Sequence, residues 1–271
     1  MMRKTAEFYQ EKSKEIRKLI LKTLHYANGS FNGGSLSAAD LLTVLFFGYL
    51  DQEQVQDVND RDMFILSKGH CSSALYAALS AVGRMPRERL FDYGKDGSTL
   101  GIHPKRDINA GIEVSAGSLG HGLALAVGSA LAARIRHADS RVFVLMGDGE
   151  CNEGSVWENA AFASRQELDH LTVIVDRNRL QGCGRDEQIL NYGDMAEKFR
   201  AFGFHTIEIN GHDFQQIDHA FEEAAAARKK PTAIIAHTIK GKGVSFMEDR
   251  LEWHYKSTTK EQYLHAVEEI V

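Results

Sequence analysis

The chain has 271 residues, of which 43% are hydrophobic and 25% charged, as expected for a globular protein with one large domain or two small ones. A net charge of −5 and a pI near 6.2 argue against a nucleic-acid or anionic-membrane partner. Three cysteines without a CxxC spacing favour reduced thiols over disulfides or a zinc site. Without a signal-like apolar core or a run of about 18 apolar residues, we expect a soluble, cytoplasmic protein.

The expected elements follow from hydrophobic periodicity. Residues 1–27 predict an amphipathic surface helix, and a second helix is expected over 37–50. From there on, short apolar segments alternate with longer helical ones. The expected strands are 62–67, 141–146, 171–176, 204–210 and 232–239, and the expected helices are 70–83, 118–138, 153–167, 193–201, 213–230 and 258–271.

The strand segments are apolar without alternation and are separated by helices. This pattern predicts the α/β class, with a parallel sheet covered by helices on both faces. Segment 118–138 is apolar almost all round, which predicts a buried central helix or an interface helix. Ligands of such sheets bind beyond the carboxyl ends of the strands. A site is therefore expected in the loops that start near Ser67, Met146, Asp176, Asn210 and Thr238.

The stretch GDGECNEG (147–154) follows one of these strands and precedes a helix. Glycines and a helix N-terminus suit a phosphate, but a carboxylate beside a phosphate is repulsive unless a cation lies between them. Asp148 would then bind a divalent metal that bridges to the phosphates, and Asn178, just past the next strand, offers a second hard oxygen. Taken alone, GDG is explained equally well by a tight turn with an aspartate cap.

GDGECNEG followed by Asn178 resembles the thiamine-diphosphate motif of transketolases. SKGHCSSALYA (67–77), EVSAGSLGHGLALAVGSALA (113–132), GHD (211–213) and TIKGKGVSFMED with EWH (238–254) extend the resemblance along the chain. The whole of 1–271 is similar to the first, diphosphate-binding domain of that family. The resemblance implies thiamine diphosphate and Mg²⁺ (or Ca²⁺ or Mn²⁺) as cofactors. It implies transfer of a two-carbon ketol unit from a ketose or ketose phosphate to an aldose.

The resemblance also implies roles for particular residues. The metal would be held by Asp148, Asn178 and the backbone carbonyl of Leu180. The cofactor would be bound by His70, Gly117, Leu119, Gly149, Glu153, Gly154, Asn178 and His254, with Glu153 also implicated in communication between active sites. An alternative explanation for the segment of Gly117 and Leu119 is that its glycines are spaced for helix packing and not for cofactor contact. An alternative for Glu153 is a negative charge at the start of a helix, which the helix dipole favours.

Twelve histidines occur, and the resemblance selects three, His70, His103 and His254, as the catalytic candidates for proton relays to substrate oxygens. A capping or packing role for His70 is the competing interpretation. His121 lies where many relatives have glutamine. Lys240 and Lys242 either neutralise a phosphate or solvate a loop.

Two positions depart from the family pattern. Phe31, in NGSFNGG, stands where members commonly have a histidine close to the reacting carbons, and phenylalanine neither donates a hydrogen bond nor shuttles a proton. The usual sugar-phosphate substrates are therefore in doubt. Tyr255 replaces the usual glycine after His254.

In the family, the glutamate that activates the cofactor lies in a pyrimidine-binding domain, which the resemblance does not find in 1–271. We expect a separate C-terminal transketolase subunit to supply it, in an α2β2 assembly, and this chain alone to be inactive. Other interpretations remain open: a variant-sugar transketolase, a dihydroxyacetone-type synthase, the alpha subunit of a 2-oxo acid dehydrogenase, or a non-catalytic regulatory homologue. A dinucleotide-binding enzyme is disfavoured because no early strand is followed by GxGxxG.

Overall fold

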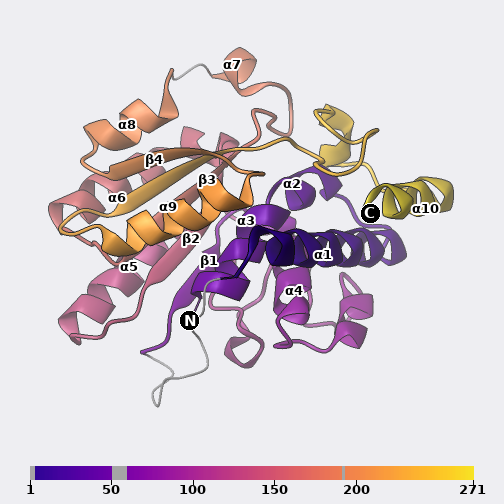
Figure 1. Cartoon of the computed structure of the whole chain (residues 1–271), viewed down its shortest axis with the longest axis horizontal. Helices are drawn as coiled ribbons and strands as arrows, with labels where there is room; N and C mark the ends of the chain where they lie inside the picture. The colour runs from indigo at the N-terminus through magenta and orange to yellow at the C-terminus, as the bar shows by residue number, and fades with distance from the viewer. Residues whose placement is uncertain (1–3, 51–59, 191–192) are drawn as a thin grey trace.

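The computed structural model describes residues 4–50, 60–190 and 193–271. Within these ranges, five parallel strands form a single sheet in the order β1-β2-β3-β5-β4. The strands are β1 (Met63–Leu66), β2 (Val142–Gly147), β3 (Leu171–Arg177), β4 (His205–Asn210) and β5 (Thr232–His237). Helices lie on both sides of the sheet (Figure 1). The predicted fold class is confirmed, and each predicted strand lies within two residues of an observed one at either end.

The α-helices are α1 (Ala6–Tyr26), α2 (Asn32–Ser37), α3 (Ala39–Val44), α4 (Ser72–Ala81), α5 (His121–Ile135), α6 (Gly154–Arg165), α7 (Asp186–Ile189), α8 (Met195–Ala201), α9 (Phe214–Ala226) and α10 (Lys260–Glu269). A π-helical turn spans Leu45–Tyr49, and 3₁₀ turns span Gly69–Cys71, Arg87–Asp92, Ile108–Ala110, Gly149–Asn152 and Leu251–His254. No helix within the described ranges has the length and apolar character needed to cross a membrane.

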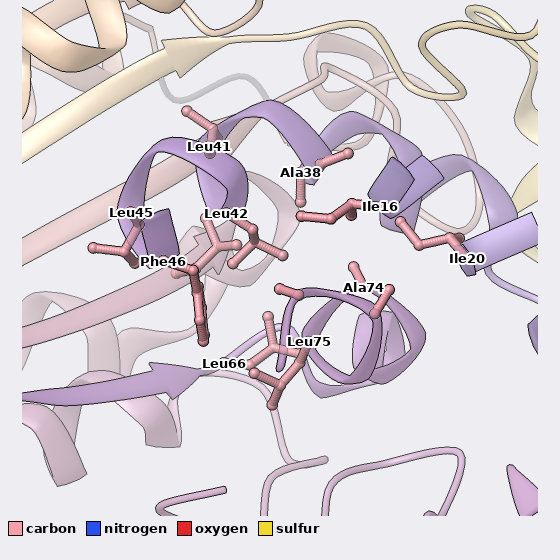
Figure 2. Close-up of a cluster of buried hydrophobic side chains, with 14 of the residues drawn as sticks. Ile16, Ile20, Ala38, Leu41, Leu42, Leu45, Phe46, Leu66, Ala74 and Leu75 are labelled. Atoms are coloured by element: carbon pink, nitrogen blue, oxygen red, sulfur yellow. The ribbon is translucent and has the colours of Figure 1, made fainter. Parts of the chain in front are cut away.

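Neighbouring residues of a strand face opposite sides of the sheet, so each strand contributes to two cores. Leu66 of β1 packs with side chains of α1, α3 and α4, which point toward one another in Figure 2. Ile65, one position earlier, belongs to the opposite core with residues of α5, α6 and α8. Burying each such large aliphatic side chain stabilises the fold by about 1.5–3 kcal/mol. Apolar strands without alternation are explained by this burial on both faces.

The predicted helix over 37–50 is observed as α3 followed without a gap by the π-helical turn. It differs from the prediction at its start, because Ser37 ends α2 and α3 begins at Ala39. The Ser37 hydroxyl donates to the Gly34 carbonyl and to the Asp176 carboxylate. A side-chain bond to a nearby carbonyl, such as the one to Gly34, competes with helix continuation. The bond to Asp176 connects α2 to the end of β3.

Helix α5 is not the fully buried central helix offered as one prediction for 118–138. One face, with Leu123, Ala126 and Val127, is buried against the sheet. The opposite face leaves Leu125 44% and Ile135 69% exposed. The alternative, an interface helix, stays a prediction.

Candidate active site

The site lies at the carboxyl edge of the sheet, where strand order brings separate loops together. β2 and β3 are adjacent, with Gly147 opposite Asp176. The GDG loop and the loop after β3 therefore start side by side, as expected from the sequence. Together with residues of α2, the Gly69–Cys71 turn and the 251–254 turn, they line a cleft of about 400 Å³.

Asp148 connects the two loops. One carboxylate oxygen accepts from the Gly149 N–H at 2.7 Å and the other from the Arg179 N–H at 2.5 Å. The side chain is buried, and burial, with the neighbouring charge of Asp176, raises the pKa of Asp148 to about 6. A cation beside this carboxylate would offset both effects.

The oxygens predicted to bind a metal line the same cleft: the Asp148 carboxylate, the Asn178 side chain and Leu180. The Leu180 carbonyl accepts from the Lys240 ammonium group at 2.7 Å, so this oxygen already faces a positive group. Arg179 takes a left-handed conformation, with φ of 62°, in the turn between Asn178 and Leu180. One carboxylate and two neutral oxygens form a donor set that suits Mg²⁺.

A second buried acid at this edge is already neutralised. Asp176 pairs with Lys68, and the hydroxyls of Ser37 and Thr238 donate to it. Burial raises the pKa of Asp176, but the Lys68 charge and the hydrogen bonds from Lys68, Ser37 and Thr238 together outweigh burial and hold the pKa below its usual value. Lys68 also donates to the Gly34 carbonyl at 3.1 Å. These bonds fix α2 against the ends of β1, β3 and β5.

Two of the predicted histidines lie together deep in the cleft. The ring centroids of His70 and His254 are 5.4 Å apart, and the Lys240 ammonium group contacts His254 Nδ1 at 2.8 Å. Burial, then the Lys240 and Lys68 charges, lower the pKa of His254 to about 4. Burial and Lys68 also hold the pKa of His70 well below its usual value. Both rings are therefore neutral at pH 7. Because Lys240 donates to Nδ1, the proton of His254 is on Nε2.

The other predicted residues divide between the cleft and the surface. His103, Gly117, Leu119 and Gly149 line the cleft. The backbone of 116–117 packs closely against Gly69, where an added Cβ would lie only 3.0 Å from it. A glycine at position 69 therefore permits Gly117 to lie at the cleft. The cleft-lining residues do not include Glu153, Gly154, His121 or Lys242. Glu153, Gly154 and His121 are exposed, and Lys242 pairs with Glu248 at 3.1 Å.

Sequence reasoning missed four polar residues of this edge. Lys68 lies within SKGH and Glu150 within GDGECNEG, but neither motif suggested a role for them. Glu150 is buried and accepts from the Ser67 hydroxyl and the Gly120 N–H, which connects the GDG loop to the start of α5. Gln181 lines the cleft, and its buried amide nitrogen has no partner within the described structure. An unpaired buried donor on a residue that lines a cleft fits an anionic ligand. Asp176 is the fourth missed residue. An acidic residue near the end of a buried, apolar strand was the feature of the sequence that could have revealed it.

Residues 9–267 match the family described as transketolase, thiamine diphosphate binding domain. The chain belongs to the transketolase family. It is 41% identical over 272 residues to one subunit of the apulose-4-phosphate transketolase of Phocaeicola vulgatus, covering all of this chain and 95% of that protein. It is 38% identical over 265 residues to the 6-deoxy-6-sulfo-D-fructose transketolase subunit SqwG of a Clostridium species, covering 96% and 95%.

The transketolase of Campylobacter jejuni is similar in structure, with a TM-score of 0.90 and 29% identity over 98% of this chain. This chain spans 43% of that protein. By contrast, it spans 95% of each of the two subunit-type relatives. The match to a thiamine-diphosphate-binding domain agrees with the cleft at the carboxyl edge. The predicted family is confirmed, and both of these relatives are named as subunits of a transketolase.

Proposed function

We propose that this chain is the cofactor-binding subunit of a two-chain transketolase that moves a two-carbon ketol unit from a modified ketose to an aldose. The observation that carries the proposal is the cleft, where Asp148, Asn178 and Leu180 meet His70 and His254. Similarity along the full length to a protein that is named as one subunit of a transketolase supports a partner chain. An α2β2 assembly is the form we propose.

The residues of the cleft fit thiamine diphosphate and Mg²⁺. The carboxylate of Asp148, the side-chain oxygen of Asn178 and the carbonyl of Leu180 would hold the metal. Gln181 and Lys240, both in the cleft, would donate to diphosphate oxygens. We place the main chain of Gly117, Leu119 and Gly149 along the cofactor. When bound, thiamine diphosphate supplies the carbanion chemistry that breaks and forms the carbon–carbon bonds.

The protein's own contribution is to position groups and move protons. His254, with its proton on Nε2, would donate that proton to a substrate oxygen, and Lys240 keeps the ring in this tautomer. His70 is neutral at pH 7 and would accept or donate at the same end of the cleft. His103, exposed at the cleft edge, would contact the donor sugar. Proton transfer by positioned groups of this kind contributes about 10²–10⁴-fold to rate.

Glu153 and Gly154 lie at the start of α6, outside the cleft. We propose that they act only once a partner subunit covers them. Support comes from apolar side chains on the neighbouring surface, where Leu125 of α5 and Phe162 of α6 are 44% and 46% exposed. A partner packed over α5 and α6 would bring Glu153 into the completed site.

The donor we propose is a modified ketose that carries an anionic group. The subunit-type relatives named above act, by their names, on apulose-4-phosphate and on 6-deoxy-6-sulfo-D-fructose. The test is to assay the co-expressed two-subunit enzyme, with thiamine diphosphate and Mg²⁺, on both donors and on fructose 6-phosphate. We expect turnover of a modified donor with release of the shortened product. Turnover of fructose 6-phosphate alone would contradict the donor proposal, and no transfer from any ketose would contradict the function.

A further inference from the structure

Phe31 lies among the three candidate histidines. Its ring centroid is 5.3 Å from that of His70, 6.4 Å from His103 and 5.5 Å from His254, each in an edge arrangement. The residue lines the cleft. A group that neither donates nor accepts a hydrogen bond thus stands where the surrounding side chains are proton carriers.

The backbone holds Phe31 there at a cost. Its φ is 68° and its ψ 25°, the left-handed region that bulky side chains rarely adopt. The strain persists because the Phe31 N–H donates to the His254 carbonyl at 3.0 Å, and its own carbonyl accepts from the Ser35 N–H at 3.1 Å. Strained residues that the surrounding structure maintains occur preferentially at functional sites.

Tyr255 extends the apolar surface across the mouth of the cleft. Its ring centroid is 6.0 Å from that of Phe31 and 4.5 Å from that of His254. Its hydroxyl reaches the loop after β3, where a Cβ at Gly182 would lie only 2.5 Å from the hydroxyl oxygen. Tyr255 therefore bridges two loops on either side of the opening, and a glycine at 182 makes room for it. The tyrosine backbone is ordinary, with φ of −116°.

We propose that Phe31 and Tyr255 form one aromatic wall that sets donor specificity, favouring a compact, branched ketose over a straight-chain ketose phosphate. A straight chain would lay successive hydroxyl-bearing carbons along the wall, where those hydroxyls lose water without gaining a partner. A straight-chain ketose phosphate would also have to extend through the mouth of the cleft, which Tyr255 narrows. A branched ketose with the same number of carbons is shorter and keeps more of its hydroxyls on the histidine side. This inference rests on the proposed function and names the substrate class for the same site.

The test uses the co-expressed two-subunit enzyme carrying Phe31→His, Tyr255→Gly or both. The probes are apulose 4-phosphate as the branched donor and xylulose 5-phosphate, which has the same number of carbons, as the straight one. For the double variant, we expect the ratio of kcat/KM values, branched over straight, to fall about 10- to 100-fold. Phe31→His gives the site a hydrogen-bonding group for substrate hydroxyls, and Tyr255→Gly widens the opening. Each single variant should move the ratio in the same direction by less.

Thiamine-diphosphate affinity is the readout that a merely structural effect would change, and we expect it to stay at the wild-type level. Phe31→Asn is the second variant, because asparagine accepts the left-handed backbone and offers hydrogen bonds. Tyr26→His, at an exposed tyrosine outside the cleft, is the matched control and should leave the ratio unchanged.

An unchanged ratio in the double and Phe31→Asn variants, with cofactor affinity intact, would overturn the inference while leaving the proposed function standing. A wild-type ratio that already favours xylulose 5-phosphate would also overturn it, as would transfer from 6-deoxy-6-sulfo-D-fructose with none from apulose 4-phosphate. Absence of transfer by the wild-type enzyme from all of these ketoses would instead contradict the proposed function, and this inference with it.

Discussion

Asp148 and Asp176 lie at the same edge of the sheet, but their surroundings push their pKa values in opposite directions. Lys68 pairs with Asp176 and holds its pKa low. Asp148 has two backbone N–H donors instead, and burial raises its pKa to about 6. Of these two carboxylates, Asp148 is the one that a bound cation would stabilise most, which explains why we assign the metal to it.

Replacing Asp148 by asparagine tests this assignment. The amide oxygen still accepts from the Gly149 or Arg179 N–H, so the fold should persist, but the charge that attracts the metal is gone. We expect Mg²⁺-dependent affinity for thiamine diphosphate in the assembled enzyme to fall by at least about 100-fold, measured by titration calorimetry. Asp96→Asn, at an exposed loop position, is the control. Wild-type affinity in Asp148→Asn would rule out the assignment.

The Lys240–His254 contact predicts a pH effect that can be observed directly. Burial is the first cause of the low pKa of His254, and the Lys240 charge is the second. In Lys240→Met the burial remains but the repulsive charge is lost, so the pKa of His254 should rise from about 4 toward its ordinary value without reaching it. An NMR titration of the imidazole measures the shift. A pKa that stays the same or falls would mean that Lys240 does not act on this ring.

At the scale of elements, a buried ion cluster holds the loop that carries Lys240. Arg17 of α1 makes two bonds to Asp40 of α3, at 2.6 and 2.7 Å, and its Nε donates to the Lys242 carbonyl. His212, from the GHD motif, contacts the same carboxylate at 2.7 Å and accepts from the Ile239 N–H through its other nitrogen. The cluster thus ties α1 and α3 to both sides of Lys240.

Asp40→Asn should weaken this arrangement. Burial raises the pKa of Asp40, but Arg17 and His212 outweigh burial and hold it well below its usual value. Leaving Arg17 buried without its charge partner should lower the free energy of unfolding at pH 7 by about 3–5 kcal/mol. Because the folded-state pKa is depressed, the stabilisation is complete above the unfolded pKa, near 3.8, and is lost as pH falls below it.

Urea unfolding at a series of pH values measures the effect. The wild-type and Asp40→Asn curves should differ at pH 7 and converge as the pH falls below about 4. Asp213→Asn is a partial control, since that carboxylate caps α9 through backbone N–H groups and has no part in the cluster. A difference that is constant with pH would show that the charge of Asp40 does not stabilise the fold.

Elements that carry a strong local pattern, such as the apolar strands, could be predicted from the sequence. Features that depend on contacts between distant residues could not. Apolar strands predicted the parallel sheet, and the rule that ligands bind at strand ends located Asp148 and Asn178. The Asp176–Lys68 pair joins the ends of β1 and β3 across β2, and no local signal gives this strand order, so the pair was not expected. Ser37, at the end of α2, donates to Asp176, which is 139 positions away, and a contact of this kind also has no local signal. Gln181 was missed because its amide nitrogen, which has no partner in the described structure, becomes informative only beside a cleft.

At the scale of the whole molecule, we propose that a partner subunit completes the active site. The cleft is open at the edge where His103 and Tyr255 are exposed, while Leu125 and Phe162 expose apolar surface on α5 and α6. Figure 1 shows these two helices on one side of the sheet. A partner subunit over this side would bury the apolar surface and close the site near Glu153.

Replacing Leu125 and Phe162 together by serine tests this surface. The isolated chain should remain folded, because both side chains are partly exposed, but its association with the partner chain should weaken by about 10- to 100-fold, in line with the loss of interface anchors. Sedimentation or calorimetry of the two chains measures the change. Ile189→Ser and Leu190→Ser, at exposed apolar positions near α7, are the matched control. Undiminished association would place the interface elsewhere.

Whether two chains form one enzyme is tested most directly by ketol transfer, measured in parallel for this chain alone, the proposed C-terminal subunit alone, and the two mixed. Each reaction contains thiamine diphosphate, Mg²⁺, donor and aldose acceptor. We expect transfer only in the mixture, and its loss when this chain carries Asp148→Asn. Transfer by this chain alone, or by the mixture at an undiminished rate with Asp148→Asn, would contradict this expectation.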